Sequence, residues 1–126
     1  MTSVYEQFAS RRKYIEDALE YARGTHTIDD IWDGIVAGNF QFWPGNKSAV
    51  VTEIQIYPRK KVMHIFLAGG DLEELLEMEK SVRAFAKTID CNSMSISGRR
   101  GWVKIFERDG WDEVCTSIVK ELDDGE

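Results

Sequence analysis

Residues 62–111 have the sequence VMHIFLAGGDLEELLEMEKSVRAFAKTIDCNSMSISGRRGWVKIFERDGW. An apolar, strand-like run opens this segment and closes at Gly69-Gly70, where Asp71 can cap a following helix. Apolar residues then recur at helical spacing over about five turns. A short strand at 92–97 and a short aromatic helix at 99–108 follow. Because both helices connect strands, the segment predicts an α/β chain with a mixed sheet.

Two further helices are predicted before this segment. Apolar residues repeat at helical spacing over residues 3–23, and Gly24 supplies a C-terminal stop. Thr27 can cap a second amphipathic helix that begins with acidic residues and ends near Gly38.

Strand patterns occupy the middle and the end of the chain. The middle predicts an antiparallel meander: a strand after Asn39, one over residues 48–57 with alternating β-branched side chains, and one over residues 62–67. Residues 111–122 predict a last strand. The expected order is α-α-β-β-β-α-β-α-β, a mixed, mostly antiparallel sheet flanked by helices.

Charge and composition narrow the function classes. The net charge of −6 argues against binding to duplex nucleic acid, which needs a basic patch to displace counterions. It suits solubility or a basic partner, and an acidic mimic of nucleic acid is an alternative. No apolar run reaches the ~20 residues of a membrane span, and residues 1–12 lack the apolar core of a signal peptide. Cys91 and Cys115 lack metal-ligand spacing, so we expect a cytoplasmic protein with reduced thiols and no metal.

The element order from about residue 48 onward resembles the GNAT acetyltransferase fold. Its most specific local match is IFERDGW at residues 105–111, an aromatic residue followed by polar residues and a glycine–aromatic pair. The resemblance implies one domain, 1–126, with a helical N-terminal part (1–38), a β meander (39–67), a degenerate cofactor-binding half (68–122) and a frayed acidic tail (123–126). It also implies acetyl transfer from acetyl-CoA.

The implied cofactor loop departs from the family pattern. The family motif expects Gln or Arg at Leu67, glycine at Gly70 and a second small residue at Leu72. Arg99 and Arg100, flanked by glycines after a strand, could supply charge for a phosphate. The candidate cofactor-binding residues are Leu67, Ala68, Gly69, Gly70, Asp71, Leu72, Arg99 and Arg100.

The chemistry that the family needs is also incomplete. Asp71, Glu73 and Glu74 suit the start of a helix but repel a pyrophosphate there. The tyrosine that protonates the leaving thiolate in many family members falls here on Phe106, which has no hydroxyl.

Six other residues are candidates for catalysis or partner binding. Glu53 or His64 could serve as a general base. Alternatively, Glu53 is a carboxylate that faces solvent, and His64 is a polar residue whose hydrogen bonds are satisfied within the fold. Trp43 and the basic turn Arg59-Lys60-Lys61 could contact a partner. Alternatively, Trp43 is a core residue at the end of a hairpin, and the basic turn is a solvated hairpin tip.

The chain is also similar to small GNAT-like proteins of tailed phages and prophages, in residues 57–70 and 97–102. The leading hypothesis is a non-catalytic, virion-associated or assembly protein in the host cytoplasm that contacts other phage or host proteins and needs no cofactor. One alternative is an acetyl-CoA-dependent N-acetyltransferase with an atypical cofactor loop. Another is an inhibitor of a host enzyme. Whether the chain is an enzyme stays open, and the residues favour a non-enzymatic role.

Overall fold

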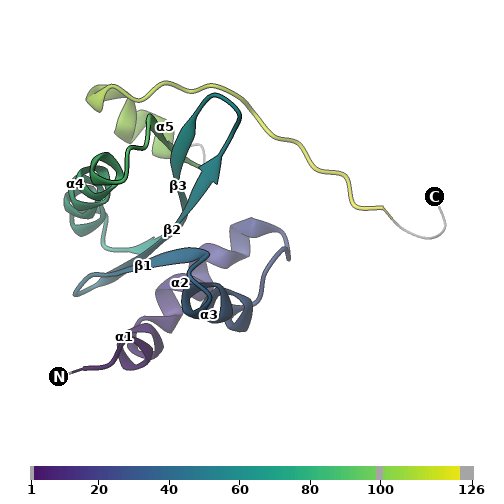
Figure 1. The fold of residues 1–126 in the computed structure, drawn as a ribbon. Coiled ribbons are helices and arrows are strands. Elements are labelled where there is room, and N and C mark those ends of the chain that lie inside the picture. Colours follow the sequence, from purple (N-terminus) through teal and green to yellow (C-terminus); the bar gives the residue numbers. More distant parts are fainter. Residues whose placement is uncertain (1, 99–100, 123–126) are drawn as a thin grey trace.

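The computed structural model describes residues 2–98 and 101–122, which form a four-stranded sheet with helices on both faces (Figure 1). β1 pairs antiparallel with β2, β2 antiparallel with β3, and β3 parallel with β4. This arrangement confirms the predicted mixed sheet and meander. The strands, in sheet order, are β1 (Phe40–Pro44), β2 (Ser48–Ile56), β3 (Lys61–Gly70) and β4 (Ser93–Ile96).

The helices divide between the two faces of the sheet (Figure 1). The N-terminal helices cover one face and the two later helices cover the other. They are α1 (Val4–Ser10), α2 (Arg12–Leu19), the 3₁₀ turn η1 (Glu20–Ala22), α3 (Ile28–Val36), α4 (Leu72–Thr88), α5 (Gly101–Phe106) and the 3₁₀ turn η2 (Glu107–Asp109).

The first helix differs from its prediction. Residues 3–23 form two helices and a 3₁₀ turn because the backbone leaves helical geometry at Arg11 (φ −112°, ψ 11°). The Arg11 side chain donates from Nε to the carbonyl oxygen of Gly45 at 2.6 Å, and thus ties the break to the β1–β2 turn. The second helix begins as predicted, with Thr27 and Asp30 forming a capping box.

A β-bulge in β3 sets which side chains face which helical layer. Val51 pairs with Leu67 and Thr52 pairs with Ile65, so Phe66 is an extra residue in β3. Ile65 consequently packs against Leu75 of α4, whereas Leu67 packs with the N-terminal helices. Because β3 continues to pair with β2 as far as Gly70, the strand is longer than the predicted 62–67.

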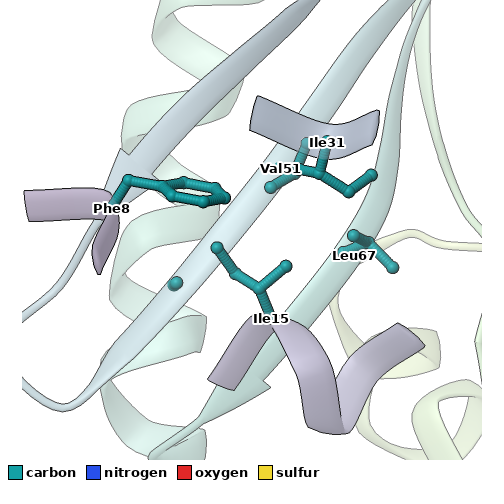
Figure 2. Close-up of a cluster of buried hydrophobic side chains, with 6 residues drawn as sticks. Phe8, Ile15, Ile31, Val51 and Leu67 are labelled. Carbon is teal, nitrogen blue, oxygen red and sulfur yellow. The ribbon is translucent and has the colours of Figure 1, made fainter. Parts of the chain in front are cut away.

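Hydrophobic side chains fill the space on both faces of the sheet. Figure 2 shows the cluster beneath α1–α3, where Phe8, Ile15 and Ile31 meet Val51 and Leu67. On the other face, α4 and α5 pack over two smaller clusters, whose buried members are Val50, Ile65, Leu75, Met63, Val82 and Ala86.

The predicted last strand is wrong for this chain. After η2, Gly110 adopts a left-handed conformation (φ 87°), and residues 112–122 run extended but pair with no strand among the described residues (Figure 1). Figure 1 shows them leaving α5 and running away from the sheet. The alternating pattern predicts an extended backbone, but a β-strand also requires a neighbouring strand with which it can form hydrogen bonds. The predicted acidic tail at 123–126 and the first residues of the predicted helix 99–108 lie outside the described residues.

Candidate functional site

A cleft opens where β3 and β4 diverge. Their register ends at Ile65 opposite Ile96, and the Ser97 amide makes a long final bond of 3.4 Å to the carbonyl oxygen of Ile65. β3 then continues to Gly70 without β4 beside it. The resulting cleft has a volume of about 1440 Å³, and residues 65–70 and 94–98 are part of its lining.

Two different walls flank the cleft. Lys13, Tyr14, Asp17 and Tyr21 line it from α2 and η1. The opposite wall includes Trp102, Phe106 and Trp111, together with part of the C-terminal segment. The cleft therefore combines an apolar aromatic wall with a wall that carries hydroxyls and charges.

Phe106 is held within an aromatic stack. Its ring stacks on Trp102, with centroids 5.6 Å apart and planes 16° apart, and contacts Trp111 at 5.2 Å. The side chain is buried among these rings. The position expected to supply an acidic hydroxyl thus serves packing, and it places no proton donor on this wall.

Both glycines at the end of β3 are required by neighbouring backbone. A Cβ on Gly69 would clash with the carbonyl oxygen of Tyr14 in α2. Gly70 has φ +113°, and a Cβ there would clash with the Lys47 carbonyl and with Ser48. These contacts explain the Gly-Gly pair by the packing of α2 and β2.

The N-terminus of α4 is occupied by acidic side chains of the chain itself. Asp71 accepts the Glu74 amide at 3.0 Å as the N-cap. Glu74 reaches the β1–β2 turn, where its carboxylate accepts from the Lys47 amide at 2.9 Å and from the Ser48 hydroxyl. The Ser48 hydrogen bond, followed by that of Lys47, lowers the pKa of Glu74 below its ordinary value. With Glu73 exposed beside them, these groups keep the helix start negative.

A polar connection crosses the sheet next to the cleft. Glu53 on β2 and His64 on β3 are direct cross-strand partners. His64 is only 8% exposed, and its Nδ1 lies 2.8 Å from Oγ of Ser95. Burial lowers the pKa of His64, an effect that the charge of Glu53 partly opposes. Since Ser95 also lines the cleft, a neutral imidazole stands one side chain away from it.

Solved structures match this architecture over almost the whole chain. A probable acetyltransferase has a TM-score of 0.69 at 8% identity, covering 98% of this chain and 96% of its own. A GNAT family acetyltransferase from Staphylococcus aureus has a TM-score of 0.64 at 11% identity, covering 96% and 95%. An acetyltransferase from Trypanosoma brucei has a TM-score of 0.62 at 10% identity, covering 89% and 95%. The fold is GNAT-like.

At these identities the likeness establishes the fold alone. No protein-family model matches the sequence, and no curated protein matches it. The predicted GNAT-like fold is therefore confirmed, whereas the assignment of an activity depends on the residues of the cleft.

The GNAT-like fold brings together only some of the predicted cofactor-binding residues. Asp71 and Leu72 lie outside the cleft lining, and Leu72 is 42% exposed at the start of α4. Arg99 and Arg100 lie outside the described residues. The predicted residues that do line the cleft are Leu67, Ala68, Gly69 and Gly70.

The candidate partner-binding residues fall into two groups. Trp43 is half-buried, donates from Nε1 to the Thr52 hydroxyl at 3.1 Å and packs against Phe85 at 5.6 Å, so the structure favours its core alternative. Lys61 donates from Nζ to the carbonyl oxygen of Ile89 at 2.6 Å, at the C-terminus of α4. Arg59 and Lys60 remain exposed at the β2–β3 turn.

Tyr14 and Tyr21 are cleft residues that the sequence did not single out. Both belong to the N-terminal helical region, where Tyr14 counts among the helix's apolar positions. Their separation of seven residues places them on one helical face, which is the signal that could have paired them.

Within the described ranges, no group of His, Cys, Asp or Glu side chains is arranged to hold a metal ion. Nor does any helix there have the length and apolar character that a bilayer crossing requires. Cys91 and Cys115 are free thiols, half-buried and exposed respectively.

Proposed function

We propose that this protein binds acetyl-CoA in the cleft between β3 and β4 and transfers the acetyl group to an amine. The divergence of these strands carries the proposal. From Leu67 to Gly70, β3 pairs with β2 but has no strand on its β4 side within the described chain. An extended ligand with amide groups, such as the pantetheine arm of coenzyme A, can hydrogen-bond to an open strand edge of this kind.

The transfer would need a base for the attacking amine. The amine nitrogen bonds to the thioester carbonyl carbon, the carbon–sulfur bond breaks, and the amine loses a proton. His64 is suited to receive this proton through Ser95, because burial favours its neutral form before the reaction. Glu53, opposite His64 in the sheet, would stabilise the resulting imidazolium. Water would protonate the leaving thiolate in place of a tyrosine at Phe106.

Binding and turnover test the two parts of this proposal separately. Thermal shift and calorimetry should detect acetyl-CoA binding, with stability rising as mass action requires. Chromatographic detection of coenzyme A release with a panel of basic amines should detect turnover. His64→Gln should retain binding and lose at least about tenfold in turnover. Absence of binding at millimolar acetyl-CoA would overturn the proposal.

A second candidate is a non-catalytic protein that acts through protein contacts, as a virion-associated or assembly factor of a phage. The acidic start of α4 favours it, because Asp71, Glu73 and Glu74 oppose a diphosphate at that position. This candidate expects no acetyl-CoA binding and recovery of virion proteins in a pull-down from infected cells. Stoichiometric recovery of one host enzyme would instead support an inhibitor.

A further inference from the structure

The C-terminal segment, residues 112–122, exposes three large apolar side chains on one face. Val114, Ile118 and Leu122 are 88%, 93% and 86% exposed. In an extended backbone, even-numbered residues share one face and odd-numbered residues share the other. These three residues share their face with Asp112, Thr116 and Lys120, and the other face carries Glu113, Cys115, Ser117, Val119 and Glu121.

The same chain carries an unpaired strand edge. β4 lies at the end of the sheet and pairs with β3 alone among the described residues. Natural edge strands are usually protected by charges, proline or a covering segment. β4, Ser-Met-Ser-Ile, contains neither a charge nor a proline, whereas β1 at the other edge ends in Pro44.

The C-terminal segment and β4 each carry apolar side chains on one face. Met94 and Ile96 of β4 lie on the α4 side, where they pack against the cluster of Val50, Ile65 and Leu75. Ser95 faces the opposite side, towards His64. A strand added beside β4 could continue the apolar layer with Val114, Ile118 and Leu122, and its other face would then lie on the side of Ser95.

We propose that the C-terminal segment is a donor strand that pairs with the free edge of β4 in a second copy of this chain. Each copy carries one donor and one acceptor, so reciprocal exchange closes as a twofold dimer. The proposal is independent of acetyl transfer, although the segment also contributes to one wall of the cleft.

The direction of the chain favours a second copy over the chain's own β4. Trp111 is anchored against Phe106, and the segment beyond it runs away from the sheet (Figure 1). Its far end contacts the η1 region through an ion pair between Arg23 and Glu121 at 3.3 Å. A segment that runs away from its own sheet can meet the free β4 edge of a second copy (Figure 1).

Light scattering coupled to size-exclusion chromatography tests the exchange on the full chain. The wild type should have twice the 14.5 kDa chain mass at high micromolar concentration. Ile118→Lys should weaken the dimer by about tenfold or more, because a buried apolar side chain is replaced by a charge. Ser117→Lys, which adds the same charge to the opposite face, should leave the dissociation constant within about threefold. Circular dichroism should show that both variants remain folded, since both side chains are exposed in the single chain.

Hydrogen exchange identifies where the segment lies. Amides of residues 112–122 should be protected in the wild-type dimer and lose that protection in Ile118→Lys. A wild type that stays monomeric with a protected segment would place it on its own β4 and overturn the proposal. A monomer with an unprotected segment would overturn it as well, as would equal effects of the two lysine variants.

Discussion

Gly69 lies against the backbone of α2, and this contact gives a direct test of why the Gly-Gly turn exists. In Gly69→Ala, the new methyl group would clash with the Tyr14 carbonyl oxygen, which cannot move without shifting the helix. We expect a loss of about 1–3 kcal/mol in the free energy of unfolding. Gly101→Ala is the matched control, because no atom lies within 4 Å of a Cβ there. It should change stability by less than about 1 kcal/mol. Equal losses in urea unfolding would contradict the packing explanation.

His64 should make stability depend on pH in the mildly acidic range. Burial lowers the pKa of His64 in the folded protein below its ordinary 6.5. The unfolded chain therefore binds more protons below about pH 6.5, and the free energy of unfolding falls as pH drops towards the folded-state pKa. The loss is about 1.4 kcal/mol for each unit of difference between the two pKa values.

Two variants separate this effect from general acid unfolding. His64→Gln should flatten the decline between pH 7 and pH 5. Glu53→Gln should extend the decline to lower pH, because the charge of Glu53 raises the pKa of His64. Urea midpoints measured across this range provide the comparison. An unchanged pH profile in both variants would show that His64 does not control it.

At the scale of elements, the first turn of α4 decides how readily a phosphate-bearing cofactor could approach. Glu73 is exposed there, whereas Glu74 is engaged by the β1–β2 turn. If acetyl-CoA binds, Glu73→Gln should tighten its affinity by about two- to fivefold at low salt. Glu77→Gln removes the same charge one turn later, and should have a smaller effect because the helix dipole acts mainly within the first turn. Calorimetry measures both, and a larger effect of Glu77→Gln would contradict a phosphate site at this helix start.

The elements that local sequence signals specify are the ones that the sequence predicted well. The Thr27 capping box and the Asp71 cap each depend on residues within one helical turn. The helix break at Arg11 and the bulge at Phe66 depend on contacts with distant segments. Neither leaves a local pattern, because the partners meet only after the chain has folded.

At the scale of the whole molecule, the cleft is a consequence of strand divergence, and no single residue encodes it. The sequence placed Leu67, Ala68, Gly69 and Gly70 near the site because the GNAT-like order positions the end of β3 there. It missed Tyr14 and the proximity of His64 to Ser95, since these depend on how α2 and β4 pack against β3.

The C-terminal segment also links the stability of the whole molecule to its concentration. Burying Val114, Ile118 and Leu122 in an exchanged dimer would stabilise it by about 1.5–3 kcal/mol for each side chain. The Arg23–Glu121 pair is exposed and contributes only about 0–1 kcal/mol. The wild-type Tm should therefore rise with protein concentration, because unfolding releases two chains.

Paired variants identify which of these contacts sets the dependence on concentration. Ile118→Lys should shift the rise in Tm to concentrations at least about tenfold higher, because it opposes burial of the apolar side chains. Glu121→Gln should preserve the rise, and added salt should also leave it intact, because screening affects an exposed ion pair but not apolar burial. Calorimetric scans over a hundredfold range of concentration, which corresponds to about 2.7 kcal/mol in a bimolecular equilibrium, make the difference measurable. A rise that disappears in Glu121→Gln but persists in Ile118→Lys would assign the contact to the ion pair and refute burial of the apolar face.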